Sequence, residues 1–539
     1  MGSDWIRDAV IYEIYPQSFA DSNGDGIGDL AGVVAHLDHI ATLGVDTIWF
    51  NPCFASPFVD AGYDVSDYLQ VAPRYGSNDD LVALVSAARE RGIRIVLDLV
   101  AGHTSVEHPW FQRELHAAGP DPDGDRYVWT TTPPPAPHAD DDLPGTPAWV
   151  ASPGPRPGWY LKNFYDEQPA LNFGWVDGGD GRPGRDATYA SGPRRNVQAL
   201  MDVIGFWLER GVAGFRVDMA FSLVKDERPS RRALELTTAV WREVRQWLDA
   251  AYPDAVLVPE GQEPRTGEPL AFDADFFLVI MREHATLFDN HGAGTLPFQP
   301  WEPPFFDAEG RGSTRAFLEG WRAAREVDPD RPVILATADH DFDRLCCGSR
   351  TAEQLGAAFA FLLTWGTVPC IYYGDEIGMR YLPGMPDVEG AVCNPGYNRA
   401  GCRTPMQWDA GPNAGFSTAD PSRLYLPVDP DPARPTVAAQ EDDPSSTLNL
   451  VRRLVTLRRS VPALGTRATT RVLHEGYPFT YLRGDSHLVV VNPRRDEAGV
   501  TAPELAGARL LLGEGVTIRG DNATADGFGF AVFALPERA

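Results

Sequence analysis

The chain of 539 residues is predicted to be an α/β protein with a (β/α)8 barrel, the TIM-barrel architecture, and three observations support this fold class. Eight short runs rich in β-branched and aromatic residues recur along the chain. Segments with apolar residues at spacings of three and four separate these runs, as βα units require. No GxGxxG fingerprint follows the first run, which disfavours the alternative of an open, doubly wound sheet.

The expected strands are AVIYEIY from residue 9, TIWFNP from 47, IRIVLDLV from 93, GFRVDMA from 214, AVLVPE from 255, DADFFLV from 273, PVILATA from 332 and VPCIYYGDE from 368. Helices are expected where apolar periodicity ends in a glycine. Clear examples are residues 29–44, 79–92 and 195–211. Strand and helix therefore alternate through most of the chain.

Two interruptions of this alternation predict further domains. Residues 104–175 are rich in Pro, Gly and Asp, and a stretch of this length in a compact chain is usually a functional insertion. We expect an inserted lobe there, with the barrel formed by residues 1–103 and 176–464. Residues 465–539 contain short strand-like runs separated by turn residues, which predicts a C-terminal antiparallel, β-sandwich-like domain.

Composition excludes several classes of partner. The formal charge of −28 and the isoelectric point near 4.7 would repel nucleic acid and anionic membrane surfaces. No basic segment followed by an apolar stretch begins the sequence, and no run of about 18 apolar residues occurs. The six cysteines show no CxxC spacing and are expected to be reduced thiols. The sequence therefore predicts a cytoplasmic protein with a neutral or cationic ligand, and leaves its oligomeric state open.

Polar residues that end apolar runs are the candidates for catalysis, because the working groups of barrel enzymes lie at the C-terminal ends of the strands. Asp218, Glu260 and Asp341 follow three different strands, whose ends a closed barrel would bring together. Two carboxyls flanking a sugar bond are what retaining glycoside hydrolysis needs. Arg216 shares its side of the strand with Asp218 and would keep that carboxylate ionised. His103 and His340 can donate hydrogen bonds to the hydroxyls of a neutral sugar.

The chain resembles the α-amylase superfamily, glycoside hydrolase family 13, over nearly its full length. The motifs are DLVAGHTS (98–105), GFRVDMAF (214–221), VPEGQ (258–262) and ATADHDFDR (336–344), with further matches in GYDVSDY, QPALNF and YYGDEIGM. The resemblance implies that Asp218 is the nucleophile, Glu260 the general acid/base and Asp341 the stabiliser of the transition state. It also implies that Arg216, His103 and His340 surround the first sugar ring, with Tyr63 as the stacking aromatic residue and Asp98 as supporting carboxylate.

Within the family, GYDVSDY and GCRTPMQW resemble the exo-acting oligo-1,6-glucosidase, α-glucosidase and trehalose synthase branch. This resemblance implies that Asp64 and Arg403 pair, grip the hydroxyls of a terminal glucose and close the pocket. Lys225, one of only two lysines in the chain, matches a lysine of that branch. A solvated surface position is the alternative interpretation of Lys225.

The segment DSNGDGIGD (21–29) offers oxygen ligands in a glycine-bent loop and resembles a metal loop of the same branch. The implied ligands are Asp21, Asn23, Asp25, Ile27 and Asp29. The ion would be a structural calcium or magnesium, and catalysis itself is expected to need no cofactor. A metal-free, hydrogen-bonded turn is the alternative.

Three positions depart from the family pattern. Gly102 and Asp339 stand where asparagine is usual, and Ala170 where aspartate is common. The change at Gly102 argues against an amylase-type calcium site beside His103. The extra carboxylate of Asp339 could bind an acceptor hydroxyl or raise a neighbouring pKa.

Two functions remain open at this point. The first is a retaining exo-α-glucosidase that cleaves terminal glucose from short α-glucosides, with α-1,6 or another non-1,4 linkage favoured. The second is a transglucosylase or a disaccharide isomerase, similar to trehalose synthase, in which a sugar replaces water as the acceptor. Both functions use the same glucosyl-enzyme intermediate, and the acceptor decides between them.

Overall fold

The computed structural model describes residues 4–132, 148–178, 185–228, 230–265, 269–289, 302–392 and 397–536. Its centre is a parallel sheet in the order β10-β9-β5-β2-β1-β13-β12-β11. The strands are β1 (Ile11–Ile14), β2 (Thr47–Phe50), β5 (Arg94–Val100), β9 (Gly214–Asp218), β10 (Val256–Pro259), β11 (Asp275–Phe277), β12 (Val333–Ala336) and β13 (Val368–Tyr372). Each of the eight predicted runs contains one of them, so the predicted barrel is confirmed.

The edge strands β10 and β11 nearly close the barrel. The amide of Asp273 donates to the carbonyl of Leu257 at 2.9 Å, and the amide of Phe276 donates to the carbonyl of Gly261 at 3.2 Å. These two bonds bring the C-terminal end of β10 beside β11. Side chains that end the strands on both sides therefore face the same opening.

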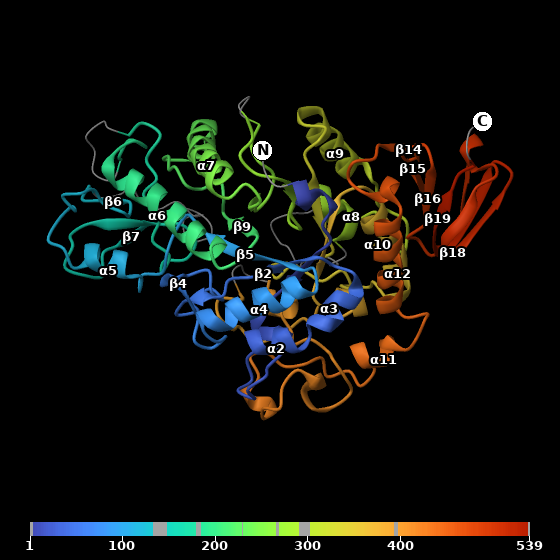
Figure 1. Cartoon of the computed structure of the whole chain (residues 1–539), viewed down its shortest axis with the longest axis horizontal. Helices are drawn as coiled ribbons and strands as arrows, with labels where there is room; N and C mark the ends of the chain where they lie inside the picture. Colours follow the sequence, from blue (N-terminus) through green and yellow to red (C-terminus); the bar gives the residue numbers. More distant parts are fainter. Residues whose placement is uncertain are drawn as a thin grey trace.

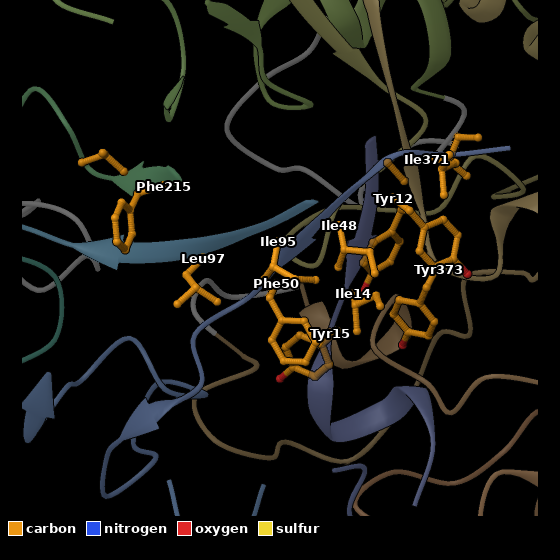
Figure 2. Close-up of a cluster of buried hydrophobic side chains, with 14 of the residues drawn as sticks. Tyr12, Ile14, Tyr15, Ile48, Phe50, Ile95, Leu97, Phe215, Ile371 and Tyr373 are labelled. Carbon is orange, nitrogen blue, oxygen red and sulfur yellow. The ribbon is translucent and has the colours of Figure 1, made fainter. Parts of the chain in front are cut away.

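Alternate residues of the strands face two different cores. Figure 2 shows side chains on the outer side, including Tyr12, Ile48, Leu97 and Phe215, which pack beneath the surrounding helices. The intervening residues fill the barrel interior, among them Ile11, Trp49, Val96, Val258, Phe276, Ile334 and Cys370. This alternation places Glu13, Asp98, Arg216 and Asp218 on the interior side as well.

Helices cover the outside of the barrel. They are α1 (Pro16–Phe19), α2 (Leu30–Ala35), α3 (Leu37–Leu43), α4 (Asn78–Glu90), α6 (Ser191–Leu208), α7 (Arg231–Ala251), α8 (Arg282–Phe288), α9 (Arg315–Val327), α10 (Leu355–Thr364), α11 (Val437–Glu441) and α12 (Thr447–Ser460). The helix expected over 29–44 is divided at His36, whose φ of −111° and ψ of 10° are not helical. Within the described ranges, no helix is both long and apolar enough to cross a bilayer.

Two smaller units lie at opposite ends of the molecule (Figure 1). One contains α5 (Pro109–Leu115) and an antiparallel sheet of β6 (Trp129–Thr130), β8 (Trp159–Lys162) and β7 (Ala148–Ala151). It corresponds to the predicted inserted lobe, although most of its proline-rich stretch, 133–147, lies outside the described residues. A short hairpin of β3 (Phe54–Ala55) and β4 (Asp67–Val71) precedes it.

The second unit is a six-stranded antiparallel sheet at the C-terminus. Its strands are β14 (Thr470–His474), β15 (Phe479–Arg483), β16 (His487–Val491), β17 (Ala498–Thr501), β18 (Arg509–Arg519) and β19 (Asn522–Ala534). Phe479, Tyr481 and Phe530 belong to the same core cluster as α10 and α12, so this sheet packs against the barrel helices. The predicted antiparallel C-terminal unit is confirmed.

Candidate active site

Strand register places the candidate catalytic groups side by side at the C-terminal end of the barrel. Asp98 on β5 is paired with Arg216 on β9, and Val100 is paired with Asp218. On the other side of β9, Val258 of β10 is paired with Arg216, so Glu260 follows two residues further along. Because residues two apart share a face of a strand, these polar side chains converge.

The guanidinium of Arg216 is the centre of this group. Its Nη1 contacts Asp98 Oδ1 at 3.0 Å and Asp218 Oδ1 at 3.1 Å, and its Nη2 contacts Glu260 Oε1 at 3.0 Å. The guanidinium carbon lies 5.2 Å from the centre of the Trp49 ring. Three carboxylates thus compensate one buried cation, which explains why charged residues occupy an otherwise apolar strand.

Glu260 lies close enough to Asp218 to affect the ionisation of Asp218. Burial and the neighbouring Glu260 raise the pKa of Asp218 well above its usual range, and Arg216 opposes this rise. Glu260 Oε2 also accepts a hydrogen bond of 2.7 Å from the amide of Met219, the residue that follows Asp218. Arg216 and the Met219 amide thus hold the two carboxyls in fixed positions beside each other, the arrangement that a nucleophile and an acid/base pair needs.

Asp341 is held in the ionised form. Burial raises the pKa of its carboxyl, but His340, Arg399 and Arg403 outweigh this effect and hold it well below its usual range. Arg399 Nη1 and Arg403 Nη2 both contact Asp341 Oδ1 at 2.9 Å. A carboxylate that stays charged in a buried site is suited to stabilising positive charge that develops beside it.

The predicted pair of Asp64 and Arg403 is wrong in this structure. Asp64 accepts hydrogen bonds from Ser56 Oγ and from the amides of Val59 and Asp60, at 2.9 to 3.1 Å, and so stabilises its own loop. Arg403 contacts Asp341 instead. The loop turns back through positive φ angles at Phe58 (62°) and Ala61 (50°), which directs Asp64 toward the preceding amides.

The acid–arginine pair of the pocket is Asp60 with Arg399. Arg399 Nη2 contacts Asp60 Oδ1 at 2.9 Å and the carbonyl of Gly390 at 2.7 Å, and Gln168 Nε2 donates to Asp60 Oδ2 at 3.0 Å. These residues join the loop after β2, the inserted lobe and the long segment after β13. Sequence reasoning missed both members of the pair, although Arg399 lies only four residues before Arg403.

Substitutions of Asp60 and Asp64, which lie in the same loop, should differ in their effect on activity. Asp60→Asn should lower kcat/KM about 100-fold, because it removes the charged partner of the arginine that also holds Asp341. Asp64→Asn should change kcat/KM less than tenfold and mainly lower the melting temperature, since Asp64 contacts only its own loop. Steady-state kinetics and thermal unfolding of both variants test this difference. A larger loss of kcat/KM in Asp64→Asn than in Asp60→Asn would contradict the assignment of Asp60 as the acidic partner in the site.

The two predicted histidines lie in the site, but their ring nitrogens already have partners. His103 Nε2 lies 3.1 Å from the carbonyl of Tyr63, and His340 Nε2 lies 2.7 Å from the Tyr63 hydroxyl. His340 Nδ1 contacts Glu13 at 2.9 Å. Burial lowers the pKa of each imidazole to about 3, so both rings are neutral at neutral pH. In this conformation they position their neighbours rather than offer free donors to a sugar.

Tyr63, the predicted stacking residue, contacts both Asp98 and His340. Its hydroxyl donates to Asp98 Oδ2 at 3.0 Å, and its ring stacks on that of His340 with a centroid separation of 5.4 Å. Trp49 Nε1 donates to the same Asp98 oxygen at 3.2 Å. Asp98 therefore links Tyr63, Trp49 and Arg216, which agrees with its expected supporting role.

Lys225 is buried, which excludes the surface interpretation. Burial lowers its pKa to about 7, and its Nζ donates to Asn163 Oδ1 at 2.6 Å. Asp339 is also buried, and its Oδ1 accepts from the amides of Asp341 and Phe342, each at 2.9 Å. Its carboxylate thus caps the loop that carries Asp341.

The predicted metal loop is a series of hydrogen-bonded turns. Asp21 Oδ1 accepts from the amides of Asn23 and Gly24, and Asp25 Oδ1 accepts from the amide of Ile27. Asp29 caps helix α2 through the amide of Gly32. In the part of the chain that the structure describes, no three His, Cys, Asp or Glu side chains are grouped as metal ligands.

Comparison with known proteins agrees with this geometry. Residues 13–177 and 320–466 match the alpha amylase catalytic domain. The chain belongs to the α-amylase family, glycoside hydrolase family 13. Among members of this family, it is 34% identical to the trehalose synthase/amylase TreS of Mycobacterium tuberculosis over 86% of this chain and 76% of that protein. It is 33% identical to a probable alpha-glucosidase of Rhizobium meliloti over 95% of this chain and 93% of that protein.

A solved structure of the same family has the same overall architecture. The trehalulose synthase MutB from Pseudomonas mesoacidophila superposes with a TM-score of 0.80, covers 99% of this chain and 100% of its own, and is 26% identical. The family and the glycoside hydrolase class predicted from sequence are confirmed. The relatives include both glucosidases and isomerases, so they leave the specific activity open.

Proposed function

We propose that this protein is a retaining exo-α-glucosidase that acts on short α-glucosides through a glucosyl-enzyme ester. The observation that carries the proposal is the contact of one guanidinium, that of Arg216, with both Asp218 and Glu260. Asp218 attacks the anomeric carbon of the terminal glucose while Glu260 protonates the departing glycosidic oxygen. Glu260 then removes a proton from the incoming water, whose oxygen displaces Asp218 and restores the original anomeric configuration.

Asp341 and its arginines support the exo mode of action. Arg399 connects Asp341 with Asp60 and with the backbone at Gly390, so segments from three parts of the chain meet beside Asp341. We propose that these segments close the non-reducing side of the site, so that a single terminal sugar enters. The preference for α-1,6 or another non-1,4 linkage is part of the proposal and rests on resemblance to the oligo-1,6-glucosidase branch.

The second candidate is a transglucosylase or disaccharide isomerase. It is favoured by the similarity to a trehalose synthase/amylase and to a trehalulose synthase. Its first step is identical, because a glucosyl ester forms on Asp218 in both cases. A sugar hydroxyl then replaces water as the acceptor that Glu260 deprotonates.

Proton NMR of the products distinguishes the two functions. The protein is incubated with maltose, isomaltose, nigerose, kojibiose, trehalose and sucrose, each at a low and a high concentration. Free α-glucose as the first product at every concentration supports the exo-glucosidase and identifies its linkage. New disaccharides or longer products at high sugar concentration support the transferase or isomerase. β-Glucose as the first product contradicts the retaining mechanism.

We also propose that the loop 21–29 holds a structural calcium ion. The donors are all oxygens: the carboxylates of Asp21, Asp25 and Asp29, the amide of Asn23 and the carbonyl of Ile27, which suits a hard cation. Two of these five ligands, the amide oxygen of Asn23 and the carbonyl oxygen of Ile27, are neutral. Calcium sites in proteins commonly combine carboxylates with such neutral oxygens. The ion would stabilise the loop beside α2.

Chelation tests the calcium proposal. Removal of the ion should lower the melting temperature by several degrees, because a ligand that binds only the folded state stabilises it, and added calcium should restore the original value. Thermal unfolding with and without chelator measures this, and Asp25→Asn should reduce the response. An unchanged melting temperature, together with a calcium-free metal analysis of the untreated protein, would contradict it.

A further inference from the structure

A buried amide of the inserted lobe lies against the catalytic residues of the barrel. Asn163 follows strand β8 and has no exposed surface (0%). Its side chain contacts the loop after β5 through His103 and the loop after β9 through Ser222 and Lys225. One side chain thus connects the lobe with two barrel loops that carry residues of the site.

The orientation of this amide follows from the chemistry of its neighbours. Lys225 Nζ donates to the oxygen Oδ1 of Asn163 at 2.6 Å. The amide nitrogen then faces His103 Nδ1 at 2.9 Å and donates to it. The proton of the neutral imidazole is therefore on Nε2, which donates to the carbonyl of Tyr63 at 3.1 Å. Asn163 in this way fixes the tautomer of His103 and, through it, the backbone of Tyr63.

The second amide proton faces the segment next to the nucleophile. Asn163 Nδ2 lies 3.3 Å from Ser222 Oγ and 3.4 Å from Met219 Sδ. Met219 follows Asp218 directly, has an unusual positive φ of 42°, and donates its amide to Glu260 at 2.7 Å. A non-glycine residue in this region of φ and ψ needs support from its surroundings, which Asn163 and Ser222 supply.

Gly102 leaves the space that this amide occupies. A Cβ atom at position 102 would lie 3.0 Å from Asn163 Nδ2 and 3.1 Å from Ser222 Oγ, closer than ordinary contacts. The space beside Gly102 is filled by the side chain of Asn163, which reaches it from the lobe. The glycine at 102 and the asparagine at 163 therefore depend on each other sterically.

We infer that Asn163 is a positioning residue for the reaction, which holds His103 and the segment after Asp218 in place from the space beside Gly102. This inference rests on the proposed function and goes beyond it, because it assigns part of the active-site geometry to the inserted lobe. It predicts that an asparagine at 102 can replace the one at 163, but only when position 163 is vacated.

Exchange of the two residues tests the inference. Asn163→Ala should lower kcat/KM about tenfold or more, because it leaves His103 and Lys225 without a buried partner. Gly102→Asn should also lower it, since its side chain meets Asn163. The double variant Gly102→Asn/Asn163→Ala should have a higher kcat/KM than either single variant. Kinetics identical to or below those of the worse single variant would overturn the inference.

Two further variants separate positioning from general stability. Asn163→Asp is isosteric and keeps an acceptor for Lys225 but cannot donate to His103, so kcat should fall about tenfold with little change in melting temperature. Asn492→Ala removes another buried amide, which donates to the carbonyls of Asp496, Ala525 and Asp526 in the C-terminal sheet unit, and should lower the melting temperature without any recovery by Gly102→Asn. Wild-type kcat in Asn163→Asp would overturn the positioning role.

The melting temperatures of these variants test the inference about Asn163 independently of the proposed function. If the wild-type protein converts none of the α-glucosides, the proposed function fails. The melting temperatures of Asn163→Ala, Gly102→Asn and the double variant still form a complete cycle. Recovery in the double variant would support the steric exchange, and its absence would overturn it.

Discussion

Asp218→Asn is expected to lower kcat/KM by about 10⁴-fold or more, the largest loss of any single substitution in this protein. The amide keeps the shape of the carboxylate and a hydrogen bond with its surroundings, but it cannot form the ester with the anomeric carbon. Because burial and Glu260 raise the pKa of Asp218, removing its charge should also leave the fold intact. Steady-state kinetics with the best substrate, together with thermal unfolding, measure both effects.

Chemical rescue makes this prediction specific for a nucleophile. In Asp218→Gly, azide can enter the vacated space and attack the anomeric carbon from the same face as the missing carboxylate. The product should be the β-glucosyl azide, since a single displacement inverts an α-glucoside, and Glu260 still protonates the departing oxygen. Asp64→Asn is the matched control, a buried carboxylate of a neighbouring loop. An α-glucosyl azide, or activity in Asp218→Asn near that of the control, would contradict the role of Asp218.

The strands and the positions of the candidate carboxylates could be predicted from sequence because both depend on local patterns. Each strand is a short apolar run, and the residue that ends it must face the barrel opening once the barrel closes. Asp218 and Glu260 follow directly from this rule, and strand register brings both to Arg216. The acidic composition of the chain does not distinguish Asp218 and Glu260 from its other acidic residues.

Pairings between loops could not be predicted in the same way. Asp60 and Asp64 lie four residues apart in one loop, and only the turn through Phe58 and Ala61 decides which of them reaches the arginine. The contacts of Asn163 could not be predicted from sequence for a similar reason, because the sequence of the lobe has no repeating pattern. Their one signal in the sequence is the unusual glycine at 102, which implies that another group fills the space.

The inserted lobe thus contributes to the geometry of the site as well as covering one side of it. Gln168 contacts Asp60 and Asn163 contacts His103, and both residues lie between β8 and the return of the chain to the barrel. Substitutions in this short segment should therefore change kinetics more than their distance from Asp218 in the sequence suggests.

Arg216→Lys should lower kcat/KM about 10²–10³-fold although the charge is unchanged. The guanidinium contacts Asp98, Asp218 and Glu260 through two nitrogens, whereas one ammonium group cannot keep the same three contacts. The attraction that lowers the pKa of Asp218 is then weakened, so burial and Glu260 raise this pKa further. At a given pH a smaller fraction of the nucleophile is ionised.

The Arg216→Lys substitution should also shift the pH dependence of kcat/KM in one direction. The nucleophile must be ionised, so activity falls as the pH drops through the pKa of Asp218, and a higher pKa moves the acidic limb of the kcat/KM profile to higher pH. The variant should therefore lose most activity at acidic pH and regain part of it as the pH rises. A uniform loss at every pH would mean that Arg216 only orients the carboxylates, and an acidic limb at lower pH would contradict its electrostatic role.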